Sequence, residues 1–347
     1  MSLKMTVAFS GNSRVQPLVD GRIRPENIDL EVVTVEGGML CFRNSQYDEF
    51  DDSETLLGGD GARWGWSGLP VFLSQGYFRL GVLVNTSSGI ETLGELKGKR
   101  IGGPDYDMTA ALWMRCGTKD LYGIDASDNV WYNGRTKEFS HGGLLGLGED
   151  GPPGVTHQWL SPDQYLDQML DSGELDAAVF SPGTGLTSGH TVSMDRYGGT
   201  PLTGNYRIRP LLDDRRRAVV ADFYRKTVAF MANHHVIVQN RMLKDDPWAA
   251  RALFKAFRES KVMAYQDARR QRATYLYFQG KDEQDHAAAF GENPYPLGLK
   301  AMRPPVDRAM QGSLEQGLIR KPMRPENIYQ PSTLDTQRPN HRGGFQC

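Results

Sequence analysis

The stretch RIGGPDYDMTAALWMRC, residues 100–116, combines side chains and backbone groups that suit the binding of an anion. A short apolar strand around Ile101 runs into a Gly-Gly-Pro turn, and an amphipathic helix is predicted from about Asp107. The first turn of a helix carries unpaired N–H groups and a partial positive charge, which favour a carboxylate. Tyr106, Met108 and Thr109 lie at this turn, and Thr109 adds a hydroxyl.

Two acidic residues in the same stretch complicate this interpretation. Asp105 and Asp107 would compete for the free N–H groups of the helix and would repel an anion. In the alternative interpretation Asp107 is the N-cap of the helix and Tyr106 is a packing residue. The sequence leaves both interpretations open.

A bound carboxylate also needs a fixed cation, and two arginines are candidates. Arg79 lies in GYFRLGV just before a predicted strand, and Arg115 lies within the predicted helix. The planar fork of a guanidinium matches a carboxylate through two hydrogen bonds. For Arg115 the alternative is a side chain that is solvated or paired with an acid.

The adjacent pair His234 and His235 is the titratable feature best suited to proton transfer, because histidine titrates near neutral pH. Neighbouring residues on a strand point to opposite faces, so only one of the two can reach a given cleft. A structural histidine is the alternative.

Two further segments could contact a ligand. The acidic run YDEFDDSE, residues 47–54, ends in Glu54, and the glycine-rich stretch that follows contains Trp64 and Trp66. Tryptophan suits stacking on a flat ring but is equally suited to a core. The alternative for the acidic run is a solvated edge.

The overall composition excludes several classes of protein. The 347 residues include 40 Lys and Arg against 42 Asp and Glu, so no global charge favours nucleic acid or an anionic membrane. No apolar run approaches the ~18 residues that cross a bilayer. The three cysteines form no CxxC motif, which argues against a disulfide scaffold and a zinc site, and Cys116 is predicted to be a small core residue.

Strands and helices are predicted to alternate, which is typical of an α/β fold with a largely parallel sheet. Apolar or alternating runs predict strands at 5–9, 28–35, 81–85, 130–132, 177–180 and 236–238. A helix is predicted after Asp246, with Leu253, Phe254, Phe257 and Ala264 on one stripe. GLGEDG, residues 146–151, has dinucleotide-loop spacing, but no helix follows it, so that function is rejected.

The amino terminus, MSLKMTVAFSG, enters a predicted strand at once and lacks the pattern of a secretion signal. We therefore expect a cytoplasmic protein.

Four segments carry a resemblance to a known family: PLVDGRIRPENIDLEVVTV (17–35), LPVFLSQGYFRLGVLVNTSSGIETLGELKGKRIGGPDYDMTAALWMR (69–115), DSGELDAAVFSP (171–182) and NHHVIVQNRMLKDDPWAARALFKAFRESK (233–261). In these segments the chain resembles the 4,5-dihydroxyphthalate decarboxylase family, whose members share the type 2 periplasmic-binding-protein-like fold. The resemblance implies two α/β lobes with a ligand cleft between them. Lobe 1 would comprise residues 1–99 together with 233–347, and lobe 2 would comprise residues 100–232, with crossings near Lys99–Ile101 and Met231–His234.

The resemblance also implies an activity: decarboxylation of a hydroxylated aromatic carboxylic acid without a metal ion or organic cofactor. The family carries arginine at the position of Arg79 and histidine at that of His234, and an Asp-x-x-Glu pattern coincides with the run that ends at Glu54. We therefore expect His234 as the proton donor, Arg79 in a carboxylate clamp, and Glu54 or Asp107 near the phenols. The predicted substrate contacts are Arg79, Tyr106, Met108, Thr109, Arg115, Trp64 and Trp66.

Two departures from the family pattern point to a substrate other than the namesake. Leu80 replaces the usual histidine after the arginine, and GGDGARWGWSG (58–68) replaces a serine-rich continuation. The alternative function is a solute-binding protein that delivers a small aromatic or other carboxylic acid to a transporter. In either case the expected partner is a small aromatic carboxylate, with no nucleic acid and no membrane, and the sequence leaves open whether the chain forms a homo-oligomer.

Overall fold

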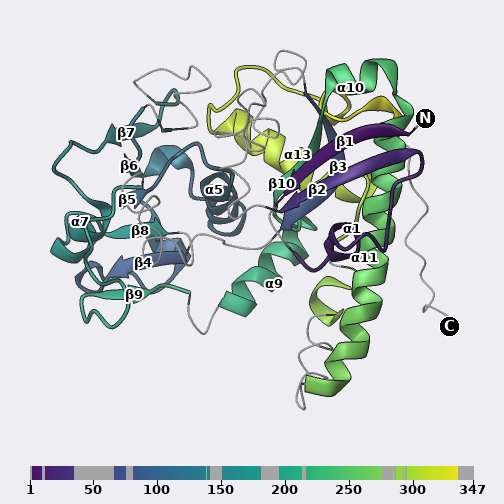
Figure 1. Cartoon of the computed structure of the whole chain (residues 1–347). Coiled ribbons are helices and arrows are strands. Elements are labelled where there is room, and N and C mark those ends of the chain that lie inside the picture. Colours follow the sequence, from purple (N-terminus) through teal and green to yellow (C-terminus); the bar gives the residue numbers. More distant parts are fainter. Residues whose placement is uncertain are drawn as a thin grey trace.

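The structure is a computed structural model of the whole chain, in which two α/β lobes lie side by side (Figure 1). It describes residues 2–9, 12–34, 66–75, 81–137, 139–140, 151–180, 195–212, 216–275, 284, 287–291, 293 and 295–334. The two-lobed α/β fold expected from the sequence is confirmed, because each lobe has its own sheet structure and its own hydrophobic core.

Lobe 2 is built on a six-stranded sheet with the strand order β7-β6-β5-β8-β4-β9. Its strands are β4 (Gly81–Asn85), β5 (Arg100–Gly103), β6 (Val130–Asn133), β7 (Thr156–Trp159), β8 (Ala177–Phe180) and β9 (Ile208–Pro210). The helices of this lobe are α5 (Thr109–Tyr122), α7 (Leu166–Ser172) and α9 (Arg216–Thr227). The four strands β7, β6, β5 and β8 are parallel, whereas β4 runs antiparallel to both β8 and β9.

Lobe 1 contains two separate strand pairs covered by a long helix (Figure 1). Its strands are β1 (Leu3–Phe9), β2 (Ile28–Thr34), β3 (Trp66–Gln75) and β10 (Ala232–Gln239), and its helices are α1 (Gln16–Val19), α10 (Asn240–Asp245) and α11 (Trp248–Tyr275). The predicted stripe on α11 is confirmed: Leu253, Phe254, Phe257 and Ala264 are all buried. Helix α11 begins one residue after Pro247, within the usual uncertainty of helix ends.

Strand β3 was not predicted, because Gly68 and Pro70 lie within it and both residues disfavour regular strands. The pairing of β3 with β10 shows how the strand accommodates the proline. The register shifts between Leu69↔Val236 and Phe72↔His235, so an irregularity in the ladder coincides with the proline.

The sheet assignment places the first crossing earlier than residues 99–101. Strand β3 belongs to lobe 1, whereas β4, which starts at Gly81, pairs with β8 from Gly81↔Phe180 to Val84↔Ala177. The chain therefore changes sheets before Gly81, and residues 81–99 lie with lobe 2. The apolar pattern of β4 reveals a strand but not its partner, which lies almost a hundred residues away.

Helix α5 lies where the two lobes meet (Figure 1). It packs against α9 and against α13 (Leu299–Glu315), and the Trp113 indole N–H donates a 2.7 Å hydrogen bond to the carbonyl of Ala232, at the start of β10. A Cβ on Gly312 of α13 would lie 2.6 Å from the Cys116 sulfur, so this glycine permits the close packing of the two helices. Cys116 is fully buried, which raises the pKa of its thiol to about 12 and confirms it as a core residue.

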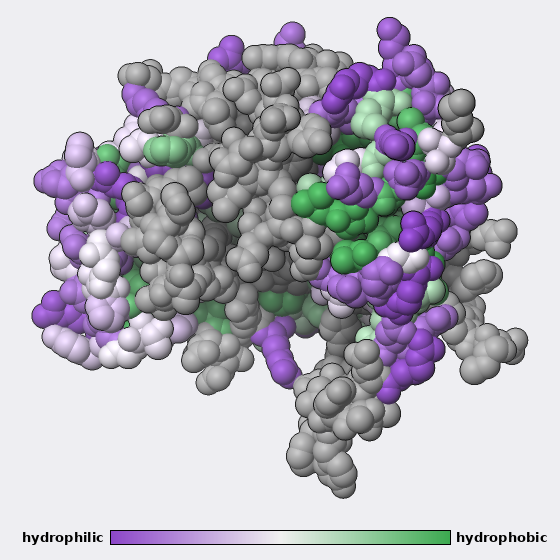
Figure 2. All heavy atoms as spheres, in the orientation of Figure 1, coloured by the Kyte–Doolittle hydropathy of each residue, from purple (hydrophilic) through white to green (hydrophobic). Residues whose placement is uncertain are grey.

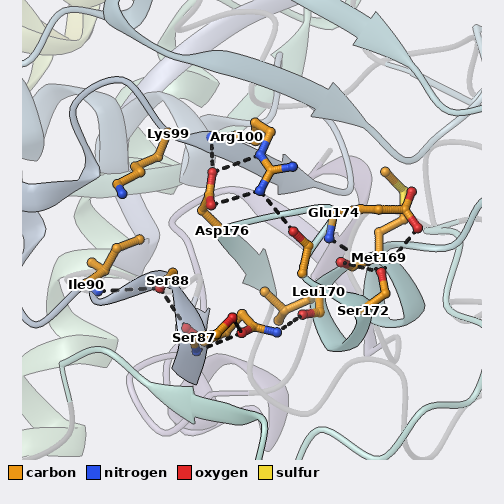
Figure 3. Close-up of polar contacts among 12 residues, drawn as sticks. Ser87, Ser88, Ile90, Lys99, Arg100, Met169, Leu170, Ser172, Glu174 and Asp176 are labelled. Carbon is orange, nitrogen blue, oxygen red and sulfur yellow. Dashed lines mark hydrogen bonds and ion pairs between the residues drawn. The ribbon is translucent and has the colours of Figure 1, made fainter.

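The amino ends of β5 and β8 are joined by a polar network (Figure 3). Asp176 accepts hydrogen bonds from the Arg100 backbone N–H at 2.9 Å, from Nε at 3.0 Å and from Nη2 at 2.9 Å. The same Nη2 also donates to the carbonyl of Gly173 at 2.9 Å. This network holds β5 and β8 side by side at their amino ends, the end of the sheet opposite to α5.

The surface of lobe 1 carries a hydrophobic area where Figure 1 draws β2 and β3, whereas the described surface of lobe 2 in the same view is mostly hydrophilic (Figure 2). Within the described ranges, no helix combines the length and the apolar character needed to cross a bilayer.

Candidate functional site

The candidate site lies at the carboxyl ends of the parallel strands of lobe 2. Strands β5, β6 and β7 end at Gly103, Asn133 and Trp159, and neighbouring strands are in parallel register. In open α/β sheets, ligands bind beyond this edge. The segment that follows β5 leads into α5, so residues 104–109 lie at this edge.

The glycines of the Gly-Gly-Pro turn serve packing. A Cβ on Gly102 would lie 2.5 Å from Leu175 Cδ1, and a Cβ on Gly103 would lie 2.8 Å from Val179 Cγ2. Both distances are shorter than real carbon contacts, so a larger residue at either position would force a neighbouring side chain to shift whether or not a ligand approaches. The turn is therefore not itself a sign of ligand binding.

The start of α5 has no side-chain cap, so the predicted role of Asp107 as N-cap is wrong. The N-cap residue is Met108, which makes no capping hydrogen bond from its side chain. The backbone N–H of Asp107 instead donates to Asp105 Oδ1 at 3.2 Å, and the backbone N–H of Tyr106 donates to Asn133 Oδ1 at 2.6 Å. Thr109 is buried, and its hydroxyl has no hydrogen-bond partner among the residues that the structure describes.

Arg115 is the most unusual residue of the site, because its guanidinium is buried without an acidic partner. The residue is 2% exposed and forms no ion pair with any described residue. Nε donates to Gln316 Oε1 at 2.5 Å and Nη2 donates to the carbonyl of Tyr106 at 2.7 Å, whereas Nη1 has no partner within the described part of the chain. The alternative of a solvated or acid-paired Arg115 is therefore wrong.

Aromatic rings surround this guanidinium. It lies 3.7 Å from the centroid of the Tyr106 ring and 5.4 Å from that of Trp131. Tyr106 also makes edge contacts with Trp131 at 5.6 Å and with His157 at 5.7 Å. The rings support the cation and shield it from water, which strengthens its attraction for an anion.

The Tyr106 hydroxyl is buried and has no hydrogen-bond partner among the described residues. Burial raises the pKa of this phenol, the nearby charge of Arg115 opposes the rise, and Asp107 adds to it. Tyr106 therefore remains a neutral hydroxyl that can donate a hydrogen bond.

His157 on β7 is a member of the site that the sequence interpretation missed. Its Nδ1 is buried without a described hydrogen-bond partner, and its ring also contacts Trp159 at 5.0 Å. Burial lowers the pKa of His157; Asp105 opposes this shift, and Arg115 adds to it. The imidazole is therefore neutral at neutral pH and can accept a proton.

Asp105 belongs to a buried charge network behind the site. Its Oδ1 accepts a 3.0 Å hydrogen bond from the Ser140 hydroxyl, and its Oδ2 lies 4.0 Å from Arg135 Nη1. Arg135 Nε in turn donates to Asp195 Oδ1 at 2.6 Å. Asp105 is one of the two acids that would oppose anion binding. Its carboxylate is directed to Ser140 and Arg135 within the protein, so it competes less for an anion at the start of α5.

The two histidines of β10 lie in different environments. His235 is buried against Phe72 and Tyr329, and burial, followed by the charge of His234, lowers its pKa to about 3. His234 is half-buried at a register shift opposite Ser74, two residues after Ala232. His235 is enclosed by these rings, so only His234 stays a candidate for the site. It lies near the start of β10, where the carbonyl of Ala232 accepts a hydrogen bond from Trp113 of α5.

Of the remaining predicted residues, the structure describes Trp66, which does not join this cluster. Trp66 lies at the start of β3, paired with Gln239, about 16 Å along the strand from His234 at ~3.3 Å per residue. Glu54, Trp64 and Arg79 lie outside the described residues.

No group of three or more His, Cys, Asp or Glu side chains that could hold a metal ion occurs within the described ranges.

Comparisons with known proteins identify two curated relatives, although no family model matches the chain. The chain is 25% identical over 341 residues to a 4,5-dihydroxyphthalate decarboxylase of Comamonas testosteroni, which covers 96% of this chain and 98% of that protein. It is 30% identical over 182 residues to a 4,5-dihydroxyphthalate decarboxylase of Pseudomonas putida, which covers 51% of this chain and 70% of that protein.

Solved structures align with the chain at lower similarity. The periplasmic aliphatic sulphonate binding protein SsuA of Escherichia coli has a TM-score of 0.45 and 12% identity, covering 100% of this chain and 99% of that chain. A putative sulfonate-binding protein SsuA of Methylobacillus flagellatus has a TM-score of 0.46 and 13% identity, covering 96% and 92%.

Proposed function

Since the chain belongs to the 4,5-dihydroxyphthalate decarboxylase family, we propose that it is a cofactor-independent decarboxylase of a hydroxylated aromatic carboxylic acid. The substrate would resemble 4,5-dihydroxyphthalate and the product would resemble protocatechuate. The buried Arg115, which has no acidic partner among the described residues, is the observation that carries this proposal.

The proposed chemistry follows from the arrangement of groups on the ring. Each carboxylate of 4,5-dihydroxyphthalate lies para to a hydroxyl. Removal of the hydroxyl proton moves electron density onto the carbon that bears the carboxylate. A proton then adds to that carbon, the bond to the carboxylate carbon breaks, and carbon dioxide leaves, while the ring regains its aromaticity and the phenol its proton.

Arg115 would bind a carboxylate of the substrate. A buried cation without a counter-ion is costly, and an incoming anion removes much of that cost. The unpartnered Nη1 supplies a donor for this contact, and the hydroxyls of Tyr106 and Thr109 supply two more. The rings of Tyr106 and Trp131 are buried beside this guanidinium, and their edges would suit contact with a flat aromatic ligand.

His157 would accept the phenol proton, because burial holds its imidazole in the neutral form. The acid that protonates the ring carbon would come from lobe 1, where His234 remains our candidate at the irregular start of β10. Asp107 stays a candidate near the phenols, because it is buried at the same edge of the sheet.

The experiment is to incubate the full-length protein with 4,5-dihydroxyphthalate and with hydroxylated benzoates and to measure carbon dioxide release. We expect release from an acid with a hydroxyl para to a carboxylate and none from phthalate, which lacks hydroxyls. Tight binding of these acids without release would contradict the proposal and favour the solute-binding alternative, which the two-lobed fold also permits.

A further inference from the structure

A second basic cluster, in which one cation is buried and the other half-buried, lies in lobe 1, remote in sequence from the strand ends of lobe 2. It consists of Arg14, in the segment between β1 and α1, and Lys261 on α11. Both residues line a small cavity whose other walls are apolar: Val15, Val71, Phe72, Leu73, Phe257 and Leu297. The cavity thus combines two cations with a hydrophobic wall.

Neither cation has an acidic partner in the described part of the chain. Lys261 is 9% exposed, and its ammonium donates to Asn293 Oδ1 at 2.7 Å and to the carbonyl of Tyr295. Arg14 donates through Nη2 to the carbonyl of Leu73 at 2.5 Å, and its guanidinium lies 4.3 Å from the centroid of the Tyr295 ring. Neutral oxygens and a ring therefore satisfy some donors but do not neutralise either charge.

The protein holds the two cations in place. The Ser260 hydroxyl on α11 donates to the carbonyl of Arg14 at 2.9 Å, which ties the Arg14 segment to the turn of the helix that carries Lys261. Keeping two like charges together in a buried position costs free energy, and such arrangements recur where an anion is bound.

The cluster lies close to the region where the lobes meet. The Tyr295 ring contacts the ring of Phe230 at 5.2 Å, and Phe230 precedes β10 by two residues. Leu73 lies near the carboxyl end of β3.

We infer that Arg14 and Lys261 form an anion-binding subsite in lobe 1 that takes a carboxylate group. The apolar wall of the cavity would contact the carbon skeleton next to that carboxylate. That the carboxylate is part of the substrate rests on the proposed function, whereas the anion site itself does not.

The protonation of Lys261 makes this site sensitive to pH. Burial, followed by the charge of Arg14, lowers the Lys261 pKa to about 7. The other groups facing the ammonium are Tyr265 at 5.2 Å, whose pKa burial raises to about 12, Asn293 and Tyr295, and none of these is an anion near neutral pH. A bound carboxylate would favour the ammonium, so affinity should fall as the pH rises above 7.

The test measures binding of phthalate to the full-length protein by calorimetry at pH 6.5 and pH 8.5. Phthalate lacks the hydroxyls needed for the proposed reaction, so the result does not depend on turnover. We expect Arg14→Met and Lys261→Met each to weaken binding at least tenfold at pH 6.5. The matched control is Lys255→Met, an exposed lysine on the same helix that faces Glu26, and it should change affinity less than twofold.

The pH dependence adds a second readout. Wild-type affinity should fall about tenfold per pH unit above 7, and Lys261→Met should abolish this fall. Arg14→Met should retain the fall but start it at a higher pH, because the charge of Arg14 lowers the Lys261 pKa. Equal affinity of wild type and both variants would overturn the inference, as would failure of the wild type to bind phthalate, benzoate or sulfate. Binding of sulfate with no binding of either carboxylate would also overturn it, because the ligand class would then be wrong.

If either variant fails to fold, the Lys261 pKa is followed by NMR of isotope-labelled lysine in the wild type. Saturation with phthalate should raise it by at least one unit, and an unchanged value contradicts the inference. Should no hydroxylated acid release carbon dioxide while binding still depends on Arg14 and Lys261, the proposed function fails and the anion site stands.

Discussion

The two ends of the six-stranded sheet differ in whether their buried polar groups have hydrogen-bond partners among the described residues. At the amino end, Asp176 accepts three hydrogen bonds from Arg100, and the Asn85 amide donates to the carbonyl of Leu170 at 2.7 Å. At the carboxyl end, polar atoms of Tyr106, Thr109, Arg115 and His157 are buried without a described hydrogen-bond partner.

This difference separates a structural end from the end at which we propose that a ligand binds. An unsatisfied buried polar atom costs about 1–3 kcal/mol, so folded proteins tolerate few of them. Several in one cluster indicate a place where a ligand supplies the missing partners. At the amino end, by contrast, the polar side chains of Asn85 and Asp176 find their partners among the described residues.

The largest expected effect is that of Arg115→Met. Loss of the contact between a buried cation and a carboxylate should cost about 4–5 kcal/mol, near the upper end for such pairs, or roughly a thousandfold in kcat/KM. The free energy of unfolding without ligand should be unchanged or higher, because the variant removes an uncompensated charge. Carbon dioxide release and urea denaturation measure the two quantities.

The matched control is Arg308→Met, since Arg308 forms a two-point ion pair with Asp120 at 2.7 and 2.9 Å. This control should lose stability and keep its activity. If Arg115→Met instead lost stability and kept its activity, as expected of the control, the proposed difference between the two ends of the sheet would be wrong.

His157→Gln should have the next largest effect, with kcat reduced about 100-fold if the imidazole is the proton acceptor. Because burial lowers its pKa, stability from the neutral imidazole is complete above the unfolded-chain value of about 6.5 and declines as the pH falls toward the lower native value. As the pH is lowered, the activity and the stability of the variant should therefore fall less steeply than those of the wild type. pH profiles of kcat/KM and of the urea midpoint measure this, and an unchanged acid limb of the rate would remove His157 from the mechanism.

Asp176→Asn should have the smallest effect and should act on stability alone. Burial opposes ionisation, but the hydrogen bonds from Arg100 hold the pKa of Asp176 below its usual value. Because Arg100 is partly exposed, we expect a loss of about 1 kcal/mol in the free energy of unfolding at pH 7. This loss should shrink as the pH falls through the native pKa of the carboxylate, since the wild type then loses the same interaction. A change of more than twofold in kcat/KM would show that the amino end is not purely structural.

The predictable parts of the molecule are those with a local signal. Apolar residues that recur with a period of two predict strands, and a period of 3.6 predicts a helix with one buried face. These periods predict the strands at 28–34, 81–85 and 177–180 and the buried stripe of α11. Tyr106, Thr109 and Arg115 were found because they are neighbours on one short stretch. His157 was missed because THQW is a four-residue strand with no signal to connect it to a helix fifty residues earlier.

Local sequence thus determined the α/β character, most of the strands and the candidate site residues at the start of α5, because these depend on residues close together in the chain. Only the tertiary structure decided that β4 belongs to lobe 2, that His157 meets Tyr106, and that Arg14 meets Lys261. The physical reason is that strand pairing and burial depend on distant partners. The lack of an acidic partner for Arg115 or Lys261 among the described residues is likewise a property of the folded environment, and no pattern of neighbouring residues encodes it.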